Sequence, residues 1–88
     1  MVHCLLDDTI KFVTLAKKHK HKLTDMKLNG NYMLKEEDFT LFASNGDTII
    51  FTENMCKIYN KSGNLVKSLN YDNIDDVLDY IDKYLSDL

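Results

Sequence analysis

The feature that most constrains the fold is the pattern of residues 74–88. Its apolar side chains recur every three or four positions and fill one continuous arc of a helical wheel. These side chains are Ile74, Val77, Leu78, Ile81, Tyr84, Leu85 and Leu88, with Tyr80 at the edge of the arc. Aspartates dominate the opposite side. The pattern predicts a C-terminal helix with one face in the core and an acidic face outward, and Asn73 is its expected N-cap.

A second helix is predicted near the N-terminus. It starts at Asp7 or Asp8, because either carboxylate suits the free N–H groups and the positive end of a helix. Its apolar stripe consists of Leu6, Ile10, Phe12, Val13 and Ala16. Leu15 falls off this stripe. We expect the helix to fade over residues 19–22, where lysines appear on every side of the wheel.

The middle of the chain is typical of β-strands. Asn45-Gly46 is a dipeptide that tolerates positive φ in a hairpin turn, and β-branched and aromatic residues flank it over 39–43 and 48–52. Residues 55–59 and 65–69 form a second predicted hairpin around the turn cluster 60–64. A weaker signal indicates a strand within 25–34, with a turn at Asn29-Gly30.

The order of these elements predicts an α+β fold in a single domain, residues 1–88. It consists of an N-terminal helix, an antiparallel β-meander of three to five strands and a C-terminal amphipathic helix, with both helices packed on one sheet face. The chain of 88 residues contains no repeat and no linker that would divide it.

Composition narrows the setting. No apolar run approaches the roughly 20 residues of a membrane span, and the first residues do not resemble a signal peptide. We therefore expect a soluble, cytoplasmic protein that does not bind membranes, with Cys4 and Cys56 as buried free thiols. All eleven basic residues are lysine, and proline is absent. This usage is typical of AT-rich codons, and indicates an AT-rich bacterium or a mobile element such as a phage.

Charge is unevenly distributed along the chain. The net charge is −3. Residues 1–35 carry seven lysines and three aspartates, whereas residues 70–88 carry one lysine and six aspartates. A basic beginning and an acidic end suggest charged partners.

Three aspartates form a narrow strip on the predicted C-terminal helix: Asp75, Asp79 and Asp82. Like charges four residues apart destabilise a helix by about 0.2–0.5 kcal/mol per pair, so the strip does not serve the isolated helix. It could face a basic partner, mimic a row of phosphates or pair with the lysines of the first helix. The alternative is a solvated face that keeps a small protein soluble.

A lysine-rich run is the second candidate site: Lys17, Lys18, Lys20 and Lys22. Such a run suggests contact with nucleic acid. However, the lysines surround the helix, and the chain has no arginine for bidentate readout. The alternative is a helix C-terminus whose cations satisfy the last carbonyl groups.

No motif indicates a metal, a cofactor or catalysis. His3, Cys4, His19 and His21 match no zinc spacing. No phosphate-binding glycine loop is present, and the three histidines do not pair with an evident nucleophile. The strand aromatics Tyr32, Phe39, Phe42, Phe51 and Tyr59 could stack on bases, but we expect them to pack in the core and across strands.

The sequence therefore predicts a small, non-enzymatic protein-interaction module. Its partner is another protein with a basic surface, contacted through the acidic C-terminal helix. An inhibitor of a host or defence protein, encoded by a phage or mobile element, is one version of this function. The alternative is a regulator that contacts nucleic acid through residues 17–22. The apolar stripes and strand edges leave a homodimer open.

Overall fold

The computed structural model describes residues 6–28, 39–52 and 55–88. In chain order they form α1 (Leu6–Lys18), the 3₁₀ turn η1 (Lys20–Lys22), β1 (Leu23–Leu28), β2 (Phe39–Ala43), β3 (Thr48–Phe51), β4 (Met55–Tyr59), β5 (Leu65–Asn70) and α2 (Ile74–Ser86). This order confirms the predicted α+β fold. The predicted turn at Asn29-Gly30 lies outside the described residues.

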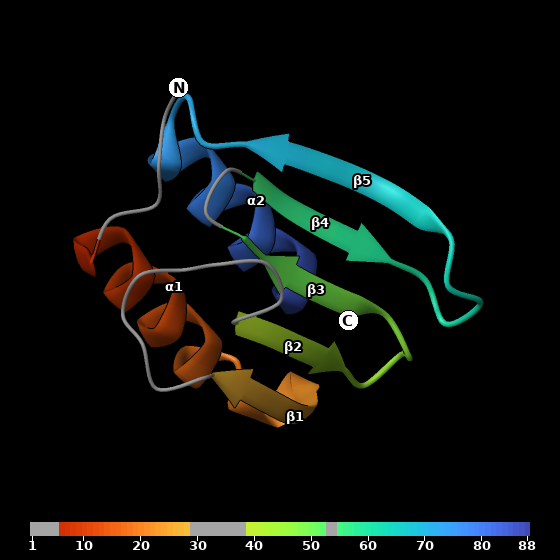
Figure 1. The fold of residues 1–88 in the computed structure, drawn as a ribbon. Coiled ribbons are helices and arrows are strands. Elements are labelled where there is room, and N and C mark those ends of the chain that lie inside the picture. Colours follow the sequence, from red (N-terminus) through yellow and green to blue (C-terminus); the bar gives the residue numbers. More distant parts are fainter. Residues whose placement is uncertain (1–5, 29–38, 53–54) are drawn as a thin grey trace.

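The strands form one antiparallel meander in the order β1-β2-β3-β4-β5 (Figure 1). The predicted hairpin at Asn45-Gly46 is confirmed, with Phe39 opposite Phe51 and Phe42 opposite Thr48. The second predicted hairpin is confirmed as β4 and β5. The early strand begins at Leu23, slightly before its predicted start, and a bulge interrupts its register between Leu23 and Asp25.

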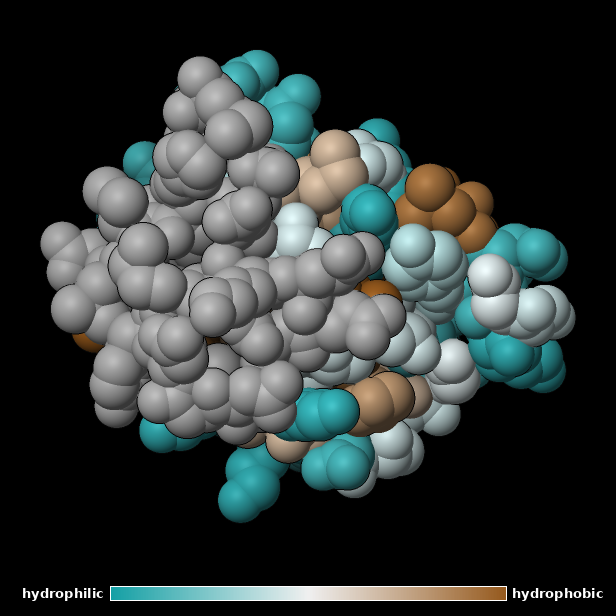
Figure 2. All heavy atoms as spheres, in the orientation of Figure 1, coloured by the Kyte–Doolittle hydropathy of each residue, from teal (hydrophilic) through white to brown (hydrophobic). Residues whose placement is uncertain are grey.

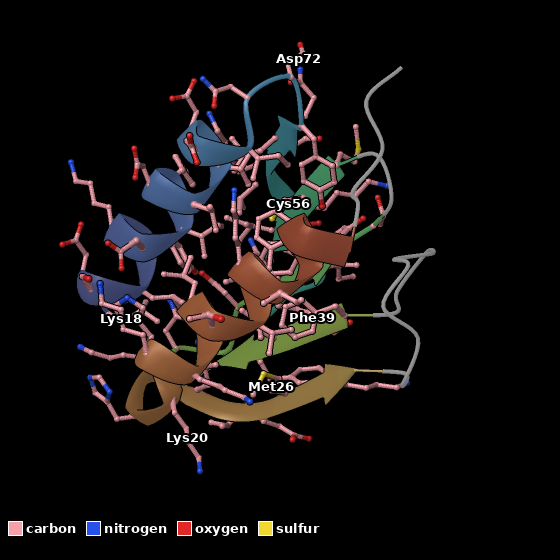
Figure 3. All side chains as sticks on the ribbon, turned by 90° about the vertical axis from the view of Figure 1, so that its left-hand side faces the viewer. Lys18, Lys20, Met26, Phe39, Cys56 and Asp72 are labelled. Carbon is pink, nitrogen blue, oxygen red and sulfur yellow. The ribbon has the colours of Figure 1, made fainter. Side chains whose placement is uncertain are left out.

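Both helices cover one face of the sheet, as predicted. Alternate strand residues point toward the helices because side chains of a strand alternate between its two faces. The core cluster consists of Phe12 and Ala16 from α1, Val77, Ile81 and Leu85 from α2, Phe39, Leu41, Ile49, Phe51, Cys56 and Ile58 from the sheet, and Tyr71. Figure 3 shows Phe39 and Cys56 in the layer between the sheet and the helices.

The aromatic residues divide between the two faces of the sheet. Phe39 and Phe51 are fully buried, with ring centroids 5.2 Å apart, which confirms their predicted core role. Phe42 and Tyr59 occupy alternate positions on the other face and are half-buried. Tyr32 lies outside the described residues.

Cys56 is a buried free thiol, as predicted. Burial raises the pKa of this thiol well above its usual range, because the apolar surroundings disfavour a thiolate. Cys56 therefore packs as a small apolar side chain rather than acting as a nucleophile. Cys4 lies outside the described residues.

The structure confirms the predicted N-cap and the predicted buried face of α2. The Asn73 side chain accepts hydrogen bonds from the backbone N–H groups of Asp75 and Asp76, at 3.0 and 3.4 Å. Three residues of the predicted apolar arc are buried: Val77, Ile81 and Leu85.

The predicted stripe of α1 is partly wrong. Ile10 was expected in the core, yet 48% of it is exposed. Leu15 was expected off the stripe, yet it is half-buried and packs against the core. The buried face is rotated because Phe12 and Ala16 point into the protein, and His19, which directly follows the helix, continues this side at helical spacing.

The two helices lie side by side and run in roughly the same direction (Figures 1 and 3). Their C-terminal ends therefore lie at the same end of the molecule. Neither described helix has the length and the apolar run that crossing a membrane requires.

The far edge of the sheet is formed by β5. Leu65 and Val66 are 52% and 54% exposed. In Figure 2 hydrophobic spheres lie over this strand at the upper right, next to hydrophilic spheres at the β4–β5 turn. The edge combines a small apolar patch with polar neighbours.

Candidate functional site

The two charged segments predicted as rival sites meet in the folded protein. The Lys18 ammonium lies 3.2 Å from Asp82 Oδ1, and His19 Nε2 lies 2.6 Å from the same oxygen. His19 is only 5% exposed, so its imidazole is held against Asp82 at the edge of the core. The hydrogen bonds from His19 and Lys18 lower the pKa of Asp82 below its ordinary value.

The direction of the helices explains this meeting. Each helix carries partial negative charge at its C-terminal end, and here two such ends lie together. Cations therefore gather between them: Lys18 pairs with Asp82, and the Lys22 ammonium donates to the carbonyl oxygen of Leu88. Of the three roles considered for the aspartate strip, pairing with the first helix is the one that Asp82 fulfils.

The lysine run is accordingly divided. Lys18 and Lys22 contact α2 and the residue that ends the described chain. Lys17 and Lys20 are exposed, and Figure 3 shows Lys20 pointing away from the protein. Two of the four lysines predicted as a nucleic-acid contact are thus engaged by other groups of the protein, although Lys18 keeps 63% of its side chain exposed.

The aspartate strip is divided too. Asp75 lies in the first turn of α2, where a carboxylate favours the positive helix end. Asp82 is paired with cations of α1. Asp79 lies between them, exposed and in the middle of the helix, and the described residues place no ion pair on it. Asp79 is therefore the member of the strip that no local contact explains.

An open groove of about 380 Å³ lies between the two helices. Its apolar lining consists of Ile10, Leu15 and Leu78, and its polar lining of Lys11, Thr14, Lys18, Asp79 and Asp82. Sequence reasoning did not predict this groove. Its one available signal was Ile10, an apolar residue on the side of α1 that also carries Thr14 and Lys18.

Another contact fixes the position of α2. The Tyr84 hydroxyl donates to the Asp47 carboxylate in the β2–β3 turn. Burial, with Asp47 adding to the effect, raises the pKa of Tyr84 to about 12. A phenol that stays neutral can keep donating to Asp47, so the hairpin turn holds the C-terminal half of α2 in place.

The described residues contain no group of three or more His, Cys, Asp or Glu side chains that could hold a metal ion. The rings of His19 and His21 lie 6.4 Å apart. His3 and Cys4, the other two residues considered as metal ligands, lie outside the described part of the chain.

No protein-family model, curated protein or solved structure matches this chain. What the candidate site can bind therefore follows from its own geometry. That geometry is an apolar groove between two helices, with opposite charges on its two rims.

Proposed function

We propose that this protein is a small, non-enzymatic protein-interaction module. It binds a partner with a basic surface through the exposed face of α2, with Asp79 as its central contact. Asp75 extends the contact toward the start of the helix, whereas Asp82 holds α2 against α1.

The observation that carries this proposal is the position of Asp79. Aspartate is a mediocre helix former, and Asp79 stands four residues from Asp75, so the pair destabilises the helix slightly. Lys83 stands four residues after Asp79, at the spacing of a stabilising pair, but the described side chains of the two form no ion pair. It borders an apolar groove, where a carboxylate can add electrostatic specificity to apolar contact.

A nucleic-acid contact through Lys17, Lys18, Lys20 and Lys22 ranks second. Binding to a phosphate backbone gains from each lysine that is available to replace counterions. Lys22, and Lys18 through an exposed ion pair, already contact other groups of the protein, which makes these two lysines less available to phosphates than Lys17 and Lys20.

The setting proposed for this interaction is the cytoplasm. All eleven basic residues are lysine and proline is absent, and this composition favours an AT-rich bacterium or a mobile element as the source. In that setting, an inhibitor that covers part of a host or defence protein fits a domain of this size.

The test is affinity capture from lysate of the source organism, or of its host, with and without nuclease treatment. The bait is the wild-type protein or the double variant Asp75→Asn/Asp79→Asn. The matched control is Asp25→Asn/Asp72→Asn, which removes the same charge from exposed aspartates that lie outside α2. We expect one protein to be captured by the wild type and the control, and lost with the Asp75/Asp79 variant.

Two results would contradict the proposal. Equal capture by both double variants would show that the α2 carboxylates are not a contact. Capture that nuclease treatment abolishes, and that Lys17→Gln/Lys20→Gln also abolishes, would establish the nucleic-acid function instead.

A further inference from the structure

We infer that the groove between α1 and α2 binds about two turns of an amphipathic helix supplied by the partner. The bound helix places apolar side chains on the groove floor, a basic side chain over α2 and an acidic side chain over α1. This inference rests on the proposed function, because it names the partner element that the same face receives.

The apolar residues at the bottom of the groove, its floor, determine where the bound helix must be apolar. Ile10, Leu15 and Leu78 line it, and Ile10 is a half-exposed aliphatic side chain in the folded protein. Two adjacent helices whose side chains leave an apolar groove are a common receptor for a third helix, which docks through residues at i, i+3 or i+4.

The length of the floor sets how much of the ligand fits. The groove follows α1 from Ile10 to Lys18, eight residue steps. At about 1.5 Å per residue this is roughly 12 Å, or two helical turns. A helix lying along it can seat two apolar side chains, at i and i+4.

The charged residues along the two sides of the groove, its rims, determine which charges the bound helix must carry. Lys11 and Lys18 belong to the α1 rim, and Asp79 and Asp82 to the α2 rim. Lys18 and Asp82 pair with each other, so the charges left for a ligand are Lys11 on one side and Asp79 on the other. Complementary charge therefore requires a helix with one basic and one acidic flank.

The experiment is selection from a phage-displayed library of helical peptides with randomised exposed positions, using the folded full-length chain as bait. We expect enriched peptides to carry apolar residues at i and i+4, Lys or Arg on one flank, and Asp or Glu on the other. Selection against Asp79→Lys, which makes both rims basic, should yield peptides with two acidic flanks. Selection against Lys11→Glu should yield two basic flanks. Flanks that do not follow these changes would overturn the inference.

The floor is tested with the peptides enriched on the wild type. Ile10→Gln should weaken their binding about tenfold or more, because it removes an aliphatic contact that binding buries. Val66→Gln is the matched control, since Val66 is similarly exposed but lies on β5. It should change the affinity less than about twofold, as expected for a residue outside the contact. Equal effects of the two variants would show that the peptides bind elsewhere.

A second copy of the chain is the competing occupant. Sedimentation of the wild type and Ile10→Gln decides between them. A monomeric wild type agrees with a partner helix, whereas a dimer that Ile10→Gln dissociates would overturn the inference in favour of self-association.

This test can fail separately from the proposed function. If the captured protein is lost with Asp75→Asn/Asp79→Asn but retained with Ile10→Gln, the acidic face is a contact and the groove is not. If Ile10→Gln also releases it, both hold.

Discussion

Asp82 is the side chain at which the first and the last helix are joined. Lys18 and His19 both hydrogen-bond to its Oδ1 atom and lower its pKa in the folded protein. A carboxyl whose folded pKa lies below its unfolded value of about 3.9 stabilises the fold above that pH. This stabilisation is lost as the pH falls through the folded pKa, because the proton then binds folded and unfolded chains alike.

We therefore expect Asp82→Asn to lower the melting temperature at about pH 6, and the difference from the wild type to shrink toward about pH 3. Melting curves followed by circular dichroism across this range provide the measurement. Asp25→Asn is the control, because it removes one negative charge without touching Lys18 or His19. A difference in melting temperature that stays constant over the whole pH range would mean that the stabilisation by Asp82 does not require its ionised form.

Among the elements, the two hairpin turns at one end of the sheet touch each other. Gly46 in the β2–β3 turn has φ +94°, and a Cβ placed there would lie 2.9 Å from the Cβ of Lys61 in the β4–β5 turn. Gly63 in the second turn has φ +84°, but a Cβ there would meet nothing within 4 Å. The two glycines thus share a positive-φ conformation that strains any other residue, and they differ in their neighbours.

This difference predicts that replacing the two glycines by alanine lowers the stability of the protein by different amounts. Both Gly46→Ala and Gly63→Ala should destabilise the protein by about 1 kcal/mol or more, because alanine disfavours positive φ. Gly46→Ala should cost more, since Lys61 Cβ is fixed to the backbone and the second turn must move. Urea unfolding of the two variants measures the difference. Equal losses would indicate that the turns do not touch in solution.

The elements also show what local patterns can predict. The hairpin strands and α2 lie where the alternation of side chains, the Asn45-Gly46 dipeptide and the Asn73 cap place them, because those signals act within a few residues. The buried face of α1 was predicted only in part, because Phe12 and Ala16 are buried as expected but Ile10 is not. Its stripe is weak, and the packing of α2 beside it decided that Leu15 is covered and Ile10 is not.

For the whole molecule, the aromatic side chains join the helix layer to the sheet. Phe12 of α1 is fully buried, with its ring centroid 4.5 Å from that of Phe51 and 5.6 Å from that of Tyr71. Aromatic pairs of this kind add to the stabilisation that burial alone provides.

We expect Phe12→Ala to reduce the free energy of unfolding by about 3–5 kcal/mol. Domains commonly have about 5–15 kcal/mol in total, so the variant should be close to unfolded. Urea denaturation measures the loss. Val66→Ala, which shortens a half-exposed side chain on β5, should change stability by no more than about 0.5 kcal/mol. Similar losses for both variants would contradict the assigned core.

The candidate site is formed by the packing of elements that are distant in sequence. The sequence therefore predicted it only in part. The aspartate strip and the lysine run are visible as local charge patterns. That Lys18 meets Asp82, and that a groove opens between them and Ile10, depends on how two helices lie on the sheet. No pattern within either helix specifies that packing.

The pairing of α1 with α2 also determines when folding can be completed during synthesis of the chain. Its contacts join residues 63 and 64 positions apart, whereas each hairpin joins neighbouring segments. Local contacts form early, and contacts distant in sequence form late. On the ribosome, the meander therefore exposes the apolar face that α2 later covers, and a nascent chain in this state is open to chaperones and to aggregation until α2 has emerged.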